Sequence, residues 1–145
     1  MSTKIGSTLG FLIAVAGLAI LVYGYHIISK NPAIIVIQVF AFFLMIWARK
    51  TFRSRSFHIS AEPTEGGLVT DGPYKYWRHP IYAAVIYFGW ACFIAFPQPE
   101  VLLAAALITV GLFIRILLEE KEIMKVYPEY AEYSKQAKRI IPFVF

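Results

Sequence analysis

Apolar residues occur in four long runs along the chain, separated by two short connections and one long polar loop. The runs are Leu9–Ile28, Ala33–Ala48, Ile81–Phe96 and Val101–Leu118. A helix that crosses a bilayer needs about 20 apolar residues, with about 17 a usual minimum. The second and third runs are slightly short, so we expect flanking tyrosines and tryptophans to extend them into the interface. The pattern predicts an all-α, polytopic membrane protein with about four transmembrane helices.

The composition agrees with membrane insertion. Hydrophobic residues make up 59% of the chain and charged residues 16%, and the mean hydropathy is +0.62. A soluble domain would carry roughly 25% charged residues. Lys4 and the run after it would also fit a signal peptide, but the run continues to Ile28 without a small-residue cleavage site, which favours an anchor. Cys92, the only cysteine, lies in a predicted span, so intramolecular disulfides are excluded and thiolate catalysis is not expected.

Basic residues gather on one side of the predicted spans. Six lie from Arg49 to Arg78, and five follow Leu118. The two short connections hold only Lys30 and Glu100. Because basic loops stay cytoplasmic, we expect both termini and the long middle loop in the cytosol. The net charge of +5 then reflects orientation in the membrane, with lipids as the surroundings, and nucleic acid is a poor candidate partner.

The chain reads as one domain, residues 1–145, with two unequal halves. Residues 1–48 form a helical hairpin without a charged residue between Leu9 and Tyr25, which is typical of a scaffold. Residues 49–145 carry the unusual polar side chains. Their middle loop is rich in residues that turn the chain and let the backbone approach a ligand. These are Pro63, Gly66, Gly67, Gly72 and Pro73.

The segment Gly72–Tyr82 places an Arg-His pair and a proline directly before the third run. Proline is favoured at the first position of a helix, so Pro80 predicts the start of the span and His79 lies just outside it. The first amides of a helix lack intrahelical acceptors, and the dipole is positive there. Arg78 and His79 add side-chain donors, so the sequence predicts an anion-binding corner. The alternative is a basic, aromatic anchor at the membrane interface.

A second polar site ends the fourth run. An arginine three residues inside the apolar boundary is costly unless it snorkels or finds a partner. Arg115 and Glu119 are four residues apart and share one helix face, whereas Glu120 points about 100° away. Arg115 could simply pair with Glu119. The two could also recognise a ligand that carries both charges.

The tail after the fourth run predicts one more helix. Pro128 suits its start and Pro142 its end, and Lys138 and Arg139 near the C-terminus complement the helix dipole. Three residues, at three- and four-residue spacing, share one face that could lie on the membrane surface or cover a pocket. They are Tyr130, Tyr133 and Ala137.

These motifs, in this order, resemble the isoprenylcysteine carboxyl methyltransferase family over roughly two-thirds of the chain. The matching segments are Gly66–Tyr74, Arg78–Tyr82, Arg115 with Glu119 and Glu120, and the tail ending Tyr130, Tyr133 and Arg139–Pro142. The resemblance implies an integral membrane enzyme that uses S-adenosylmethionine, with a cofactor pocket made by the cytosolic loop and the C-terminal helix. The implied cofactor-binding residues are Leu68, Val69, Tyr74, His79, Pro80, Ile81, Tyr82 and Glu119.

The resemblance also implies that Arg115 contacts the substrate. The cofactor's carboxylate suits the corner at His79, and its ammonium suits Glu119. A carboxylate acceptor is already ionised and needs no general base, and Arg115 could orient it. An amine acceptor needs a base, for which Glu120 is the nearby candidate. The sequence leans towards the carboxylate, with Arg115 and Glu120 as the candidate catalytic residues.

The preferred hypothesis is therefore a membrane methyltransferase without a metal site. Its acceptor would be a lipophilic small molecule or a prenylated substrate that enters from the bilayer, and its active site would face the cytosol. In a prokaryote the membrane would be the cytoplasmic one. An NADPH-dependent, sterol-type membrane reductase is one alternative, against which the lack of a Gly-x-Gly-x-x-Gly run weighs only weakly. A non-enzymatic membrane scaffold is the other.

Overall fold

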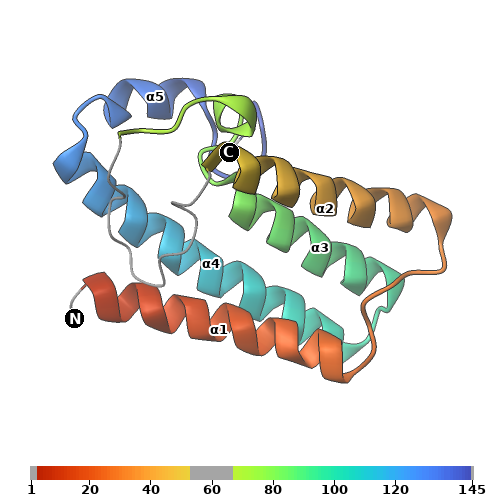
Figure 1. The fold of residues 1–145 in the computed structure, drawn as a ribbon. Coiled ribbons are helices and arrows are strands. Elements are labelled where there is room, and N and C mark those ends of the chain that lie inside the picture. Colours follow the sequence, from red (N-terminus) through yellow and green to blue (C-terminus); the bar gives the residue numbers. More distant parts are fainter. Residues whose placement is uncertain (1–2, 53–66, 145) are drawn as a thin grey trace.

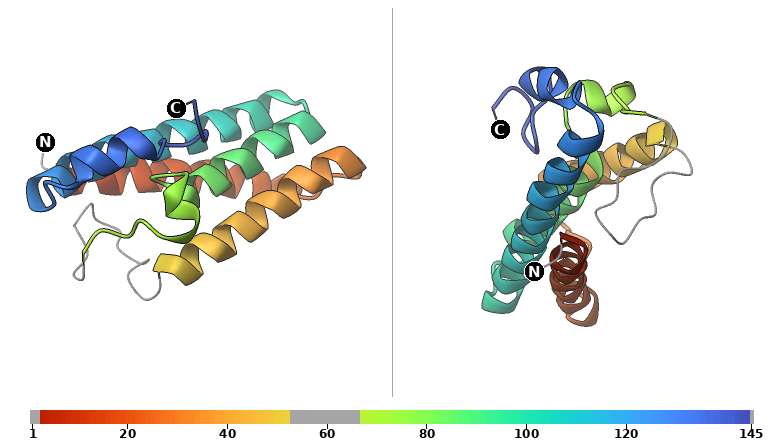
Figure 2. Two further views of the ribbon diagram at one scale, coloured as in Figure 1. Left: turned by 90° about the horizontal axis from the view of Figure 1, so that it is seen from above. Right: turned by 90° about the vertical axis from the view of Figure 1, so that its left-hand side faces the viewer.

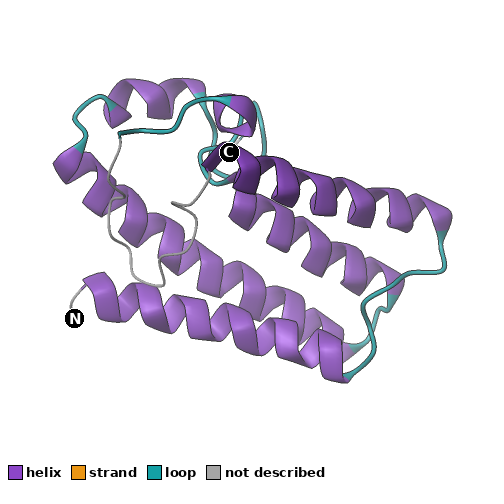
Figure 3. Cartoon of the chain, in the orientation of Figure 1, coloured by secondary structure: helices purple, strands orange, loops and turns teal. Residues whose placement is uncertain are grey.

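The computed structural model describes residues 3–52 and 67–144, and every regular element within them is helical (Figure 3). The elements are α1 (Thr3–Tyr23), α2 (Pro32–Phe52), the 3-10 helix η2 (Gly72–Lys75), α3 (Pro80–Ala95), α4 (Pro99–Val126) and α5 (Tyr130–Gln136). The prediction of an all-α protein is confirmed.

The four long helices form two packed pairs, α1 with α4 and α2 with α3 (Figures 1 and 2). Helix α3 also packs against α4 and thereby joins the two pairs. The short connections lie at one end of this bundle. The other end holds the start of α3, the end of α4, and the two short helices η2 and α5 (Figure 1). The polar residues that the sequence singled out therefore gather at one end.

Three of the helices, α1, α2 and α4, are long and apolar enough to cross a membrane. Helix α3 is apolar but has only 16 residues, so its role as a fourth span stays a prediction. Many large apolar side chains are exposed on the outer faces of the bundle, a pattern that a bilayer accommodates and water does not. They include Val36, Phe40, Phe42, Phe43, Leu103 and Val110. The protein is a polytopic, all-α membrane protein.

Small residues let α1 lie directly against α4. On the buried face of α1 they recur every three or four residues, at Gly6, Gly10, Ala14 and Gly17. A Cβ atom at Gly10 would lie 2.6 Å from the carbonyl oxygen of Gly111, and one at Gly17 would lie 2.6 Å from that of Ala104. Real side chains do not approach so closely, so both positions require glycine. Close backbone packing of this kind drives helix association in membranes.

The first helix differs from the predicted span Leu9–Ile28, because it begins at Thr3 and ends at Tyr23. Tyr25 adopts a positive φ of 57°, and the amide of His26 donates to the carbonyl oxygen of Leu21 at 3.0 Å. This left-handed turn, which glycine usually forms, closes the helix about one turn before the apolar run ends.

A buried glutamine explains why the apolar residues after Tyr23 form a loop. Gln38 on α2 donates from Nε2 to the carbonyl oxygen of Ile27 at 2.6 Å, and its Oε1 accepts from the amide of Ser29 at 3.2 Å. These bonds replace the backbone bonds that a longer helix would have made. Hydropathy alone does not reveal such a contact between segments.

The other long helices agree better with the apolar runs. Helix α2 continues to Phe52, one turn beyond its predicted end, and α3 agrees within one residue at each end. Helix α4 continues two turns past Leu118, to Val126. The helix therefore extends beyond its apolar stretch and carries its glutamates on regular helical backbone.

The tail helix is shorter than predicted. Pro128 lies in the turn before α5, which begins at Tyr130 and ends at Gln136 instead of reaching Pro142. Ala137, which follows the helix, has an extended backbone and is fully buried. The predicted start and end of this helix were both wrong.

Backbone pairing with the segment before α3 ends the tail helix. The amide of Lys138 donates to the carbonyl oxygen of Tyr76 at 3.1 Å, and the amide of Arg78 donates to that of Lys138 at 2.6 Å. The two segments thus form a parallel bridge at Trp77 and Lys138. This bridge moves Arg139 away from the end of the helix, where its charge was predicted to act, and towards the start of α3.

The predicted orientation can be tested with single cysteines at opposite ends of the bundle. Ala131 and Gln98 are both exposed, and the native Cys92 is fully buried. If the basic end is cytosolic, Ala131→Cys should react with an impermeant thiol reagent only after the membrane is opened. Gln98→Cys should react in intact cells. The opposite pattern would contradict the predicted sidedness.

Candidate functional site

Helix α3 begins as its proline predicts. Pro80 lies in the first turn and His79 is the N-cap residue, and the amide of Ala83 makes the first intrahelical bond, to His79, at 2.9 Å. The side chain of His79 makes no capping hydrogen bond. The amides of Ile81 and Tyr82 therefore have no intrahelical acceptor. Together with the positive end of the dipole, they form a site that favours an anion.

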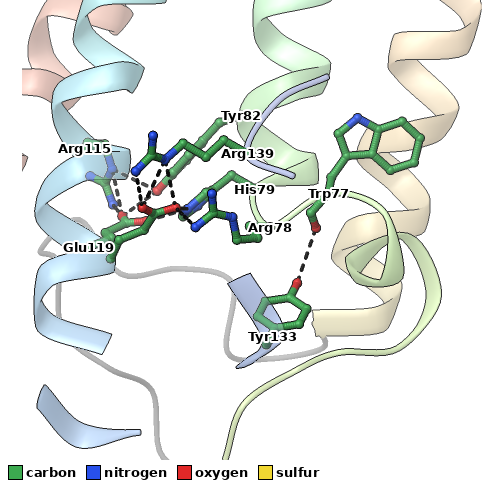
Figure 4. A network of polar contacts seen from close by, with 9 residues as sticks. Trp77, Arg78, His79, Tyr82, Arg115, Glu119, Tyr133 and Arg139 are labelled. Atoms are coloured by element: carbon green, nitrogen blue, oxygen red, sulfur yellow. Dashed lines mark hydrogen bonds and ion pairs between the residues drawn. The ribbon is translucent and has the colours of Figure 1, made fainter. Parts of the chain in front are cut away.

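Glu120 is the centre of a buried cluster of charge that ties three segments together. Its side chain is 4% exposed and lies within ion-pair distance of Arg78 (Nη1, 3.0 Å), His79 (Nε2, 3.2 Å) and Arg139 (Nη2, 3.0 Å). Arg78 and His79 precede α3, and Arg139 comes from the tail (Figure 4). Removing one member of such a buried cluster would leave an uncompensated charge, so its members are strongly held together. The cluster therefore fixes the position of His79.

On the neighbouring face of α4, Arg115 contacts Glu119 of the same helix and Tyr82 of α3 (Figure 4). Its Nη2 and Nε atoms lie 2.7 and 3.1 Å from Oε1 of Glu119, and Nε lies 2.9 Å from the hydroxyl oxygen of Tyr82. Tyr82 donates to the same carboxylate oxygen at 2.6 Å. The guanidinium also lies over the rings of Phe11, at 5.5 Å, and Tyr82, at 5.6 Å. The predicted ion pair is therefore present and is enclosed by α1, α3 and α4.

The site retains polar atoms that a ligand could use. Oε1 of Glu119 accepts the bonds just described, whereas Oε2 lies 3.9 Å from Nδ1 of His79, beyond hydrogen-bond distance. Nε of Arg78 is also buried and has no hydrogen-bond partner among the described residues. Buried polar atoms without partners are rare in proteins, so this atom and Oε2 of Glu119 are candidates for contact with a polar ligand.

Aromatic residues join η2, α5 and the tail next to this site. The hydroxyl of Tyr133 donates to the carbonyl oxygen of Tyr74 at 2.7 Å. The same hydroxyl lies 3.5 Å from the carbonyl oxygen of Trp77 (Figure 4). Nε1 of Trp77 donates to the hydroxyl of Tyr87 at 3.1 Å, and Tyr87 in turn donates to the carbonyl oxygen of Ile140. Burial raises the pKa of Tyr133 well above its usual value, so its hydroxyl remains a donor at physiological pH.

The structure brings most of the predicted site residues together. They are His79, Pro80, Ile81 and Tyr82 at the start of α3, and Arg115, Glu119 and Glu120 on α4. Tyr74 is buried in η2, next to the α5 residue Tyr133. Leu68 and Val69 are half-buried in the segment before η2 and take no part in the polar network of the described residues. The loop residues Pro63 and Gly66 lie outside the described residues.

Two residues of the site were not predicted. Arg139 was expected at the end of a helix and instead contacts Glu120. Phe11 was expected in a plain scaffold and instead lies against Arg115. Arg139 gave a weak signal, as a basic residue in the tail motif. Nothing in the sequence distinguishes Phe11 from the other apolar residues of its helix.

Fold and site together define a class of protein: an integral membrane protein with a buried, charged site where the helices end. Residues 49–130 match the model of the phospholipid methyltransferase family, which covers more than half of the chain, and the chain belongs to that family. The matched region contains both clusters on α4, but neither Phe11 nor Arg139. The resemblance to membrane methyltransferases is thereby confirmed.

One curated relative extends the comparison. The chain is similar to methanethiol S-methyltransferase 1 of Bradyrhizobium diazoefficiens, with 33% identity over 86 residues. That match covers 59% of this chain and 30% of the relative, so the chain spans less than a third of the relative's length. None of the solved structures matches the chain. The comparisons therefore place the chain in a family of membrane methyltransferases and leave its own reaction and acceptor to be argued from the site.

Proposed function

We propose that this protein transfers a methyl group from S-adenosylmethionine to a lipophilic acceptor at the cytosolic boundary of the membrane. The observation that carries the proposal is the proximity of two features, the start of α3 after His79 and a carboxylate oxygen of Glu119. The side chain of His79 makes no capping hydrogen bond, and Oε2 of Glu119, which lies 3.9 Å from Nδ1 of His79, accepts no hydrogen bond from the described residues. The methionine end of the cofactor carries one carboxylate and one ammonium. Those two charges fit the two features.

The residues present fit the cofactor in the following roles. The amides of Ile81 and Tyr82, together with His79, would hold its carboxylate, and Glu119 would hold its ammonium. The family supplies the expectation that Leu68, Val69, Tyr74 and Pro80 line the same pocket. When bound, the cofactor supplies a methyl group activated by its sulfonium. The protein's main contributions are then alignment of the acceptor and exclusion of water.

A carboxylate acceptor, of the isoprenylcysteine type, needs the least from the protein. The new C–O bond forms as the S–CH3 bond breaks, which gives a methyl ester and S-adenosylhomocysteine without a proton transfer. Arg115 would orient the ionised acceptor. Arg115 and Glu119 form an ion pair. In the complex with both ligands, Arg115 would contact the acceptor and Glu119 would contact the cofactor.

A thiol acceptor is the second candidate, because the relative's name assigns it methanethiol. A thiol must lose its proton on the way to the thioether, and so must an amine. The nearby base that the sequence suggests is Glu120. In the structure Arg78, His79 and Arg139 surround that carboxylate and favour its ionised form. This arrangement makes Glu120 a weak base and supports the carboxylate acceptor.

Calorimetric titration of the detergent-solubilised protein tests the cofactor. We expect S-adenosylhomocysteine to bind and NADPH not to bind. Methyl transfer to N-acetyl-S-farnesylcysteine and to dodecanethiol then separates the two acceptor classes. Binding of NADPH alone would favour the reductase, and binding of neither would favour a scaffold.

His79→Ala tests the anion corner directly. The substitution removes the imidazole, whose Nδ1 makes no hydrogen bond to the described residues and would face the cofactor's carboxylate. It should weaken S-adenosylhomocysteine binding by about 1.5–3 kcal/mol, as for other hydrogen bonds to charged groups. Lys75→Ala is the matched control, because Lys75 is an exposed cation four residues away, in η2. Calorimetry should show unchanged binding in the control. Equal losses in both variants would mean that general charge attraction, and not a specific site, binds the cofactor.

A further inference from the structure

Phe11 reaches the site from a helix that the family match does not include. Its ring lies 5.5 Å from the guanidinium carbon of Arg115, on one side of that group. The ring of Tyr82 lies at 5.6 Å. Arg115 is only 4% exposed, whereas Phe11 is 36% exposed. The phenylalanine ring thus contacts the buried arginine and also reaches the surface of the bundle.

The position of Phe11 is fixed by the backbone next to it. Gly10 packs against the carbonyl oxygen of Gly111, one turn before Arg115 on α4. This contact sets the register of α1 against α4, so the ring cannot shift along the arginine without separating the helices. Because α1 is a candidate membrane span, the exposed edge of the ring meets lipid. A lipophilic molecule that approaches Arg115 from the bilayer along α1 would meet Phe11 first.

We propose that Phe11 determines acceptor specificity by limiting the approach of a lipophilic acceptor from the bilayer to Arg115. The inference rests on the proposed methyl transfer and on Arg115 as the residue that orients the acceptor. A rigid ring over the guanidinium restricts the width of the group that can lie beside it. It also stabilises the cation by an interaction of the cation with the ring face. Family membership does not supply this residue, since residues 49–130 alone match the family.

Chemical modification of Arg115 tests access without depending on turnover. Detergent-solubilised protein is treated with phenylglyoxal, and modification of Arg115 is followed by mass spectrometry of its peptide. Phe11→Ala should make the modification several times faster, and Phe11→Trp should make it slower. Leu12→Ala is the matched control, because Leu12 is the next residue and is 55% exposed. An equal rate in Phe11→Ala and Leu12→Ala would overturn the proposal.

Turnover tests specificity with pairs of acceptors that differ in width and length. The pairs are S-hexyl- and S-farnesyl-N-acetylcysteine, and hexanethiol and farnesylthiol, because the methyl-branched farnesyl chain is both wider and longer than a straight hexyl chain. Phe11→Ala should raise kcat/KM for the larger member of the accepted pair relative to the smaller by about tenfold, within the range for changes in apolar pockets. Affinity for S-adenosylhomocysteine should stay unchanged. Phe11→Leu, which keeps an apolar side chain, should give a smaller change in the same direction.

The outcomes separate this inference from the proposed function. A wild-type protein that binds no S-adenosylhomocysteine and methylates none of these acceptors would refute the proposed function, while the phenylglyoxal rates would still decide whether Phe11 shields Arg115. A wild-type protein that methylates one pair, with the same preference in Phe11→Ala, would keep the function and overturn the role of Phe11.

Discussion

Glu119→Gln should greatly weaken cofactor binding and leave the protein folded. The amide keeps an oxygen for Arg115 and Tyr82 but removes the negative charge that would bind the cofactor's ammonium. A hydrogen bond to a charged group contributes about 1.5–3 kcal/mol. Because the substitution also removes the attraction between the carboxylate and the ammonium, we expect a loss of binding free energy at or above the upper end of that range. Calorimetry with S-adenosylhomocysteine measures this change directly. Unchanged affinity would refute the assignment of Glu119 to the cofactor.

Arg115→Leu should have the complementary effect. Affinity for S-adenosylhomocysteine should remain near that of the wild type, while methyl transfer is lost because the acceptor is no longer oriented. If Arg115 and Glu119 only stabilise each other, either substitution should mainly lower the melting temperature, and the double variant should recover part of the loss. Measuring affinity, turnover and melting temperature on both single variants and the double variant separates the two interpretations. Full activity in Arg115→Leu would be incompatible with the proposed role.

Gly111→Leu should have the largest effect on stability. A side chain at this position would enter the backbone of α1, where a Cβ would lie 2.6 Å from the amide nitrogen of Ala14. Because backbone cannot give way as a flexible side chain can, we expect a loss of about 3 kcal/mol or more, at the upper end for overpacked cores. Thermal unfolding in detergent measures the loss.

Val110→Leu is the control for that substitution, because Val110 is the preceding residue on α4 and is 54% exposed. Its melting temperature should match that of the wild type. Separation of α1 from α4 in Gly111→Leu should also remove Phe11 from Arg115, so phenylglyoxal modification of Arg115 should become faster. Equal melting temperatures for the two variants would show that close packing of α1 on α4 does not hold the bundle together.

The sequence resemblance and the structure support the function at different levels. Membership of a membrane methyltransferase family agrees with the motifs at His79 and Glu119, since both lie in the matched region. The acceptor is a separate question. The surroundings of Glu120, which the motif does not describe, are what weigh against its use as a base and towards an ionised acceptor.

The sequence by itself determined the features that follow from local rules. Apolar runs located the long helices, Pro80 located the start of α3, and the spacing of Arg115 and Glu119 placed them on one helix face. Each of these depends on residues within about one helical turn of one another, or on the length needed to cross a bilayer. Such features can be predicted without knowledge of how the helices pack.

Only the tertiary structure decided where α1 and α5 end and which residues complete the site. Gln38 fixes the loop after α1, and backbone bonds to Tyr76 and Arg78 turn the tail away from its helix. The same packing brings Phe11 to Arg115 and Arg139 to Glu120. Each of these contacts joins residues far apart in the chain, and its free energy exists only once the helices have packed. Hydropathy and spacing, which describe neighbours along the chain, therefore carry no signal for them.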